Sequence, residues 1–323
     1  MLSLDDIRGL NIELSSKCGA SCPFCSRNQK VRTYGSHLIT LTDFKKLPQS
    51  LLQNLKWVTF AGNFGDMSTN PETVDIVSYL KSINPGLTIE GDSNGSLQNE
   101  DWWASLGSLL QDGNMVFSVD GLEDTNSIHR KGTDYRRIIK NMKAFTGAGG
   151  VAYWQFILFK HNEHQVDEAE EMAKEAGCRR FFVLTSRDYD ETCQRPESID
   201  VAVKRQVFHS YRAKAMDKEE GARCKPLYNG SLYIAADGTV YPCCLAHCMY
   251  ITEHNAAFDF IVPLTRKYHH AINFKHTPLS EIIGGEYFNE IFKLSRKNLY
   301  CIMKCNSFKK DIKKDLVIRD SWF

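Results

Sequence analysis

Short β-type runs alternate with helix-type segments through the first two thirds of the chain. Residues 10–14 (Leu-Asn-Ile-Glu-Leu) alternate apolar and polar side chains, which is typical of a strand with one buried face. Helical segments instead repeat apolar residues every three or four positions, as Val74, Val77 and Leu80 do. The pattern predicts strands at residues 10–14, 57–60, 87–90, 115–119, 153–159 and 180–184, and helices at residues 42–55, 71–80, 102–110, 135–145 and 164–176.

Six strand–helix units in series predict a parallel sheet, because each helix returns the chain to the end from which the next strand starts. We therefore expect an α/β fold over residues 1–187, with the sheet either open or curled into a partial (β/α)6 barrel of TIM type. In such folds functional residues gather at the carboxyl ends of the strands. Residues that directly follow a predicted strand are the first candidates for a site.

The alternation stops near Asp188. Residues 188–223 are polar and are expected to form a connector, and residues 224–323 a second domain. Within that domain, residues 231–241 predict a β-hairpin on an Asp-Gly turn, framed by Cys224 and Cys243.

The composition excludes several classes of protein. With 323 residues, 42% hydrophobic and 24% charged, the chain is neither disordered nor fibrous. A net charge of +1 gives little attraction to nucleic acid, and the basic run at residues 304–314 is typical of a solvated face. No apolar run approaches the roughly 20 residues that span a bilayer, and the N-terminus has no secretory signal. We expect a soluble, cytoplasmic protein that does not bind membranes or nucleic acid.

The chain contains eleven cysteines, which is unusual for such a protein. An odd number without an export signal argues against a disulfide framework. Three cysteines follow the first predicted strand with the spacing C-x3-C-x2-C: Cys18, Cys22 and Cys25. Three thiolates suit a [4Fe–4S] cluster because they leave one iron open to a ligand that reacts. A zinc site with His37 as the fourth ligand is the alternative, although that spacing is outside the usual range.

The C-x3-C-x2-C spacing, with Phe24 before the third cysteine, resembles the signature of the radical S-adenosylmethionine (SAM) superfamily. The resemblance implies a partial barrel whose cluster binds the amino and carboxylate groups of SAM at its open iron. One electron then cleaves SAM to a 5′-deoxyadenosyl radical. The cofactors carry this chemistry, while the protein positions and shields them.

Further segments resemble the superfamily in the same order. Residues 61–66 (Ala-Gly-Asn-Phe-Gly-Asp) stand where the family receives the SAM amino group, and residues 117–121 where it borders the SAM ribose and the substrate. The following His-Arg-Lys-Gly at residues 129–132 is typical of the subgroup with a C-terminal cluster domain. The resemblance implies these SAM-binding residues: Phe24, Gly62, Gly65, Asp66, Asn94, Ser118 and Asp120.

The C-terminal cysteines resemble the twitch domain, the shorter relative of the SPASM domain, which is built from a β-hairpin and helices. The resemblance implies one auxiliary [4Fe–4S] cluster held by Cys224, Cys243, Cys301 and Cys305. Cys244 or Cys248 could replace one of these ligands or belong to a second site. A small zinc site on the same hairpin is the alternative.

The resemblance implies an oxidoreductase-type radical SAM enzyme that abstracts hydrogen from a substrate C–H bond, with oxidation assisted by the auxiliary cluster. The substrate would be a small molecule or a peptide or protein segment, and the reductant a flavodoxin or ferredoxin. Because Cys18 comes so early, we expect no N-terminal leader-peptide domain. An epimerase or a peptide-crosslinking enzyme is the second reading, with Cys193 as hydrogen donor and Asp120 as a further catalytic candidate. A zinc-stabilised binding module without catalysis is the alternative from another class.

Overall fold

Eight strands form one sheet in the order β6-β5-β4-β3-β2-β1-β7-β8. The computed structural model describes residues 2–28, 33–197, 224–252 and 260–298, together with Cys301 and Cys305. The strands are β1 (Gly9–Ile12), β2 (Trp57–Phe60), β3 (Thr88–Ser93), β4 (Asn114–Ser118), β5 (Ala152–Leu158), β6 (Arg180–Thr185), β7 (Ser231–Ile234) and β8 (Val240–Tyr241).

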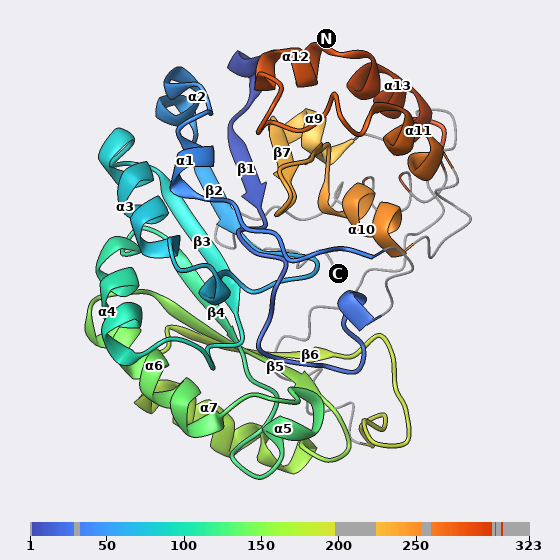
Figure 1. Cartoon of the computed structure of the whole chain (residues 1–323). Coiled ribbons are helices and arrows are strands. Elements are labelled where there is room, and N and C mark those ends of the chain that lie inside the picture. The colour runs from blue at the N-terminus through green and yellow to red at the C-terminus, as the bar shows by residue number, and fades with distance from the viewer. Residues whose placement is uncertain are drawn as a thin grey trace.

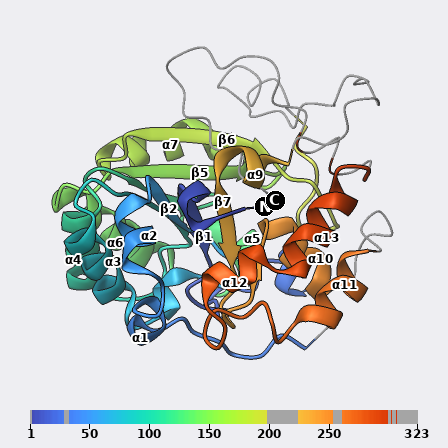
Figure 2. The same cartoon turned by 90° about the horizontal axis from the view of Figure 1, so that it is seen from above.

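The first six strands are parallel and lie side by side in chain order. Leu10 of β1 stands opposite Val58 of β2 on one side and Leu232 of β7 on the other. Figure 2 shows that the sheet curls, with helices on its outer side. The predicted partial barrel is therefore confirmed, and all six of its carboxyl strand ends open on the same rim.

Helices cover the convex face of the sheet and gather beside its β7 end. Figures 1 and 2 show α3, α4 and α6 along the outer side of the sheet, and α11, α12 and α13 together next to β7. The α-helices are α1 (Leu41–Phe44), α2 (Gln49–Asn54), α3 (Thr73–Ile83), α4 (Glu100–Leu109), α5 (Asn126–His129), α6 (Tyr135–Gly147), α7 (Val166–Glu175), α9 (Lys225–Asn229), α10 (Cys244–Thr252), α11 (Ile261–Tyr268), α12 (Leu279–Gly284) and α13 (Glu286–Ser295). Short 3-10 turns are η1 (Leu4–Asp6), η2 (Ser26–Asn28), η3 (Met67–Thr69) and η4 (Glu163–Gln165).

Two details of the predicted elements are wrong. The single helix expected at residues 42–55 is two short helices, α1 and α2, because Pro48 between them disfavours helix at the residue before it. The strand at residues 10–14 is not half exposed: Leu10 and Ile12 are buried on one face, and Glu13 is buried on the other. A strand inside a parallel sheet has both faces covered, so its polar positions point into the barrel.

The predicted hairpin is confirmed as β7 and β8, which pair antiparallel. It also extends the barrel's sheet, since β7 runs parallel to β1 over four residue pairs. Of the expected connector, residues 198–223 lie outside the described residues, and so does the basic run at 304–314 apart from Cys305. The predicted domain boundaries stay predictions. None of the described helices has the length and apolar character needed to cross a membrane.

Candidate functional site

The three N-terminal cysteines lie on the loop after β1, and all three are free, partly buried thiols. Donors reach two of their sulfurs. The Ala20 N–H lies 3.4 Å and the Asn94 amide 3.6 Å from Cys18 Sγ, and the Arg130 guanidinium lies 3.9 Å from Cys22 Sγ. Hydrogen bonds to sulfur are a known means by which proteins tune iron–sulfur clusters. The loop is therefore held by groups suited to thiolate ligands.

Burial raises the pKa of Cys18 to about 12, and the neighbouring charge of Asp66 adds to this. Burial also raises the pKa of Cys22, although Arg130 opposes the effect. Such thiols lose their protons when a metal ion binds them. A set made only of thiols, with donors aimed at the sulfur, fits an iron–sulfur cluster that Cys18, Cys22 and Cys25 would hold.

Asp66 and Asn94, two of the predicted SAM-binding residues, contact each other directly. Asp66 Oδ2 accepts hydrogen bonds from the Asn94 side chain at 2.6 Å and from the Asn94 N–H at 2.9 Å. Its Oδ1 accepts from Ser68 Oγ at 2.6 Å and from Ser93 Oγ at 2.9 Å. Asp66 therefore ties the loop after β2 to the end of β3, and Asn94 extends this link to Cys18.

Gly62 and Gly65 are required because the loop after β2 passes very close to β1 and the residues that follow it. A Cβ on Gly65 would lie 1.7 Å from the Ser15 carbonyl oxygen, and one on Gly62 would lie 2.7 Å from Glu13 Oε1. Real Cβ atoms do not approach other atoms so closely, so no side chain fits at either position. Both predicted glycines shape the loop that Asp66 anchors.

Glu13 is a site residue that the sequence analysis missed. Its Oε1 accepts hydrogen bonds from the Phe64 N–H at 2.6 Å and the Gly65 N–H at 3.0 Å, and the side chain is buried. Burial raises the pKa of Glu13 to about 7, against the effect of these backbone donors. The sequence signal that points to it is a carboxylate within a strand of a predicted barrel. A charged side chain in a barrel interior needs hydrogen-bond partners, so such a residue is a candidate for the site.

The same carboxylate faces a buried histidine from the C-terminal part of the chain. His247 Nδ1, on α10, lies 3.8 Å from Glu13 Oε2 and 3.3 Å from the Asn63 amide. Burial lowers the pKa of His247 to about 4. Asn63 also donates to the Cys244 carbonyl at 2.9 Å. The glycine loop is thus bonded both to β1 and to the helix that follows Cys243.

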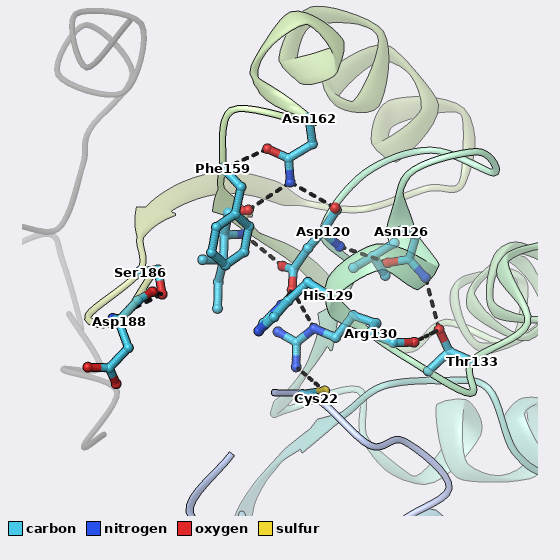
Figure 3. A network of polar contacts seen from close by, with 12 residues as sticks. Cys22, Asp120, Asn126, His129, Arg130, Thr133, Phe159, Asn162, Ser186 and Asp188 are labelled. Carbon is cyan, nitrogen blue, oxygen red and sulfur yellow. Dashed lines mark hydrogen bonds and ion pairs between the residues drawn. The ribbon is translucent and has the colours of Figure 1, made fainter. Parts of the chain in front are cut away.

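Asp120, directly after β4, is the centre of a buried charged network (Figure 3). Its Oδ2 lies 2.6 Å from His129 Nδ1 and 2.5 Å from Arg130 Nε, and its Oδ1 accepts from the Ile157 N–H at 2.7 Å. Burial alone would raise the pKa of Asp120, but Arg130 and His129 hold it below its usual value. Because Arg130 also reaches Cys22, the network connects the end of β4 to the cysteine loop.

The backbone of Asp120 is fixed as well. Its N–H donates to Asn126 Oδ1 at 2.9 Å, and its carbonyl accepts from the Asn162 amide at 2.8 Å, as Figure 3 shows. A fully buried carboxylate with partners on both oxygens is suited to positioning Arg130 and His129 rather than to reacting itself. Ser118, the last residue of β4, comes two residues earlier on the same strand end.

Phe24 and Cys193 flank this network. The Phe24 ring stacks on His129 with the ring centroids 6.0 Å apart. Cys193 is buried, and burial raises its pKa to about 11; the charges of Asp190, Asp120 and Cys22 add to this, and Lys131 opposes it. The predicted hydrogen donor therefore lies on the same side of the barrel as the cysteine loop and Asp120.

The C-terminal thiols form a second group. Cys224 precedes α9, Cys243 follows β8, and Cys301 comes after α13. The pKa of Cys224 is raised by burial and then by the nearby Cys243, Cys305 and Cys301, and that of Cys301 is raised to about 12 by burial, Cys243 and Cys305. Cys224, Cys243, Cys301 and Cys305 are thus near enough to affect one another's pKa, and an all-thiol set has the chemistry of ligands for such a cluster.

Cys244 and Cys248 lie one helical turn apart on α10. Burial raises the pKa of Cys248, and its thiol is hydrogen-bonded to the side chains of Ser26 and Thr252 and lies near Cys25. Cys248 is therefore placed between the two groups of thiols, and Cys244 next to Cys243. Burial, Cys243 and Cys248 all raise the pKa of Cys244, so this thiol lies near both of them.

Comparison with known proteins agrees with this arrangement. The sequence profile of the radical SAM superfamily matches residues 12–176, and that of an iron–sulfur cluster-binding domain, SPASM, matches residues 205–307. The PqqA peptide cyclase of Gluconobacter oxydans (strain 621H) is 23% identical over 252 residues, which are 72% of this chain and 68% of that protein.

Solved structures show a similar fold at 15% identity. The structure of SuiB from Streptococcus suis bound to S-adenosylmethionine matches with a TM-score of 0.54. The match covers 77% of this chain and 62% of the SuiB chain. The enzyme anSMEcpe with bound AdoMet has a TM-score of 0.60, over 97% of this chain and 89% of that chain. SuiB is also known bound to its precursor peptide SuiA, and anSMEcpe bound to the Cp18Cys peptide.

The match to SPASM, which is an iron–sulfur domain, displaces the zinc-stabilised binding module as a reading of the C-terminal thiols. The match to the first domain covers slightly more than half of the 323 residues and includes the cysteine loop, the glycine loop and the Asp120 network. The chain belongs to the radical SAM superfamily, and its C-terminal part to the iron–sulfur cluster-binding SPASM domains.

Proposed function

We propose that the protein is an enzyme that binds S-adenosylmethionine on a [4Fe–4S] cluster held by Cys18, Cys22 and Cys25. The observation that carries this proposal is the convergence of two further strand ends on the cysteine loop. Asn94, after β3, and Arg130, after β4, both donate to its sulfurs. When bound, the cluster and SAM supply a 5′-deoxyadenosyl radical that removes a hydrogen atom from a substrate C–H bond.

The protein's own residues position SAM and keep water from it. Asp66 already accepts hydrogen bonds from Ser68, Ser93 and Asn94, so the amino group of SAM would join or replace one of these donors. Arg130 brings a buried positive charge to the edge of the cysteine loop, and Asp120 fixes the orientation of that guanidinium. Charge that is oriented before the reaction needs no reorganisation during it.

Cys224, Cys243, Cys301 and Cys305 would hold the auxiliary cluster. A cluster held by these residues would supply an acceptor for one electron, which together with hydrogen abstraction would amount to a two-electron oxidation of the substrate. This supports an oxidoreductase-type reaction. The buried, mutually close thiols of this group are the feature that favours it.

For the substrate, we propose a peptide or an exposed protein segment rather than a small molecule. The support comes from the related proteins, because one is a peptide cyclase and two are known with peptides bound. Crosslinking or cyclisation of a peptide is included in this class.

Epimerisation of a peptide residue is the second candidate, and the position of Cys193 favours it. The thiol S–H would give a hydrogen atom to the substrate carbon radical, and an external reductant would return one electron, with one proton, to the resulting thiyl. In D2O the wild type is then expected to place deuterium on the product carbon. Cys193→Ala is expected to release 5′-deoxyadenosine without that deuterium, and deuterium retained in this variant would exclude the role.

The main proposal is tested by purifying the protein without oxygen. Two [4Fe–4S] clusters predict about eight iron and eight sulfide per chain, and reductant plus SAM should release 5′-deoxyadenosine. Cys18→Ala/Cys22→Ala/Cys25→Ala should abolish this release and retain about half of the iron. Cys178→Ala, a partly buried thiol outside both groups, is the matched control and should leave both values unchanged. Release that survives the triple substitution contradicts the assignment.

A further inference from the structure

A groove of about 860 Å³ runs between α9 and α13, next to the start of β1. It lies at the amino ends of β1 and β7, whereas the cysteine loop follows the carboxyl end of β1. Figure 1 shows α9 and α13 together beside the start of β1, away from α5. The groove is therefore a separate surface from the site described above.

Its walls carry exposed apolar side chains. Tyr228 is 84% exposed and Leu227 39%, and both line the groove. In the part of the chain that the structure describes, only two other large hydrophobic residues are exposed, Leu294 and Tyr189. Apolar side chains gathered at one surface favour a protein contact over exposure to water.

The rim of the groove is positively charged. Arg8, Lys293, Arg296 and Lys297 are exposed there. The only carboxylate lining it, Asp6, already accepts hydrogen bonds from Ser3. Cations in the last turn of a helix stabilise its dipole, which accounts for Lys293, but Arg8 comes from a different element.

Both walls of the groove are close to cysteines of the C-terminal group. The Leu227 N–H is hydrogen-bonded to the Cys224 thiol, and the Tyr228 N–H donates to the Cys224 carbonyl at 3.0 Å. On the other wall, Asn298 Oδ1 accepts from the Cys301 N–H at 3.1 Å, just after Lys297. The apolar wall of the groove thus contacts Cys224 directly, and the basic wall ends one residue before Asn298, which contacts Cys301.

We propose that this groove docks an acidic electron-carrier protein of the flavodoxin or ferredoxin type, which exchanges one electron with the auxiliary cluster. The inference rests on the proposed function, because it requires that cluster. Such a partner matches both features of the surface: acidic groups face Arg8, Lys293, Arg296 and Lys297, and an apolar patch packs on Leu227 and Tyr228. Complementary charge raises the rate of association, while buried aromatic contacts slow dissociation.

The exchange is tested by mixing the dithionite-reduced, desalted holoenzyme with an oxidised flavodoxin in a stopped-flow instrument. The auxiliary cluster loses one electron, and the flavin takes up that electron and one proton. Lys293→Glu/Arg296→Glu/Lys297→Glu is expected to lower the second-order rate constant about tenfold or more at low salt. The difference should vanish in high salt, because salt screens these charges.

The matched control reverses three exposed charges on α6, Arg137→Glu/Lys140→Glu/Lys143→Glu, and should stay within about twofold of the wild type. Tyr228→Ala should slow the exchange at every salt concentration. A neutral quinone as electron acceptor should oxidise all variants at the same rate, which shows that the cluster itself is intact. Equal rates for the groove variant and the wild type with flavodoxin, or equal slowing in the α6 variant, overturn the docking inference.

A failure of the proposed function gives a different experimental result from a failure of the docking inference. If iron analysis and electron paramagnetic resonance find no auxiliary cluster in the wild type, the proposed function and the inference both fall. If the wild type is a dimer that Tyr228→Ala dissociates, the groove belongs to a second copy of the chain, and the electron carrier is excluded as its occupant.

Discussion

The two groups of thiols differ in what surrounds them. The N-terminal group is contacted by polar and charged side chains from other strand ends, with Asn94 at Cys18 and Arg130 at Cys22. The C-terminal group lies beside helices that line the groove, and there the Cys224 thiol accepts from the Leu227 N–H while the nearest charges that shift its pKa are those of other thiols. A cluster that binds a reacting molecule needs oriented charge around it, whereas one that only transfers electrons needs burial and a short path to the surface. The surroundings match these two proposed roles.

The largest effect is expected from removing one ligand of the C-terminal group. Cys243→Ala should lower the iron content by about half, because three thiolates in a site built for four hold the auxiliary cluster poorly. Cys244→Ala is the matched control, since it changes the neighbouring thiol, which is not among the four proposed ligands. The check is iron analysis of protein purified without oxygen. If Cys244→Ala loses iron and Cys243→Ala does not, the assignment of the two residues is reversed.

The next prediction concerns the charge that distinguishes the N-terminal group. Arg130→Gln leaves Asp120 buried without its cation, and breaking such a pair costs about 3–5 kcal/mol. We expect a markedly lower thermal unfolding midpoint, measured without oxygen, together with loss of SAM cleavage. Because Arg130 and His129 lower the pKa of Asp120, the pair stabilises the wild type above the unfolded pKa of this carboxyl and loses its effect as the pH falls through the folded value.

Arg136→Gln is the control for that substitution. Arg136 Nε also lies 2.6 Å from a carboxylate, Glu123, but the two side chains are 78% and 56% exposed. Exposed pairs contribute only about 0–1 kcal/mol. If Arg130→Gln and Arg136→Gln lower the thermal unfolding midpoint by similar amounts, the burial of the Asp120 network is not what stabilises this region.

Much of the fold could be predicted from the spacing of apolar residues alone. The strands at residues 57–60 and 180–184 and the helix at 135–145 differ from the structure by at most two residues at either end. The alternation of residues 10–14 does not show whether the polar side chains of the first strand face solvent or the interior of the barrel. It therefore predicts an exposed Glu13, whereas the structure buries this residue. The helical spacing of apolar residues also continues across Pro48, so it predicts one helix where the structure has α1 and α2.

Residues of the site could be predicted from the sequence only where they belong to a recognisable motif. The cysteine loop, the glycines and Asp120 could be assigned by resemblance, but the pairing of Glu13 with His247 joins residues from the two ends of the chain. His247 belongs to no motif, and its partners come from folding β7 beside β1. Contacts of this kind depend on the order of strands in the sheet, which no local pattern in the sequence encodes.

Glu13 offers a test of how the two regions are joined. Its folded pKa, about 7, is above the usual value of 4.5 for a glutamate, so the folded state binds more protons and stability falls as the pH rises between these values. Glu13→Gln removes this dependence, and the wild type should lose up to about 3 kcal/mol relative to the variant between pH 5 and pH 8. Thermal unfolding at several pH values measures it. Glu171→Gln, at an exposed position on α7, should follow the wild type at every pH.

The smallest effect is expected from the hydrogen bond that joins the two regions directly. Asn63 donates to the Cys244 carbonyl, so Asn63→Ala leaves that acceptor and His247 without this donor, at a cost of about 1–2 kcal/mol. Because the bond connects the glycine loop to α10, the variant should unfold at a lower temperature and also bind SAM more weakly, while its iron content stays the same. Asn289→Ala, on the exposed face of α13, should change neither stability nor SAM binding. Unchanged SAM affinity in Asn63→Ala would mean that the C-terminal region stabilises the barrel without influencing its site.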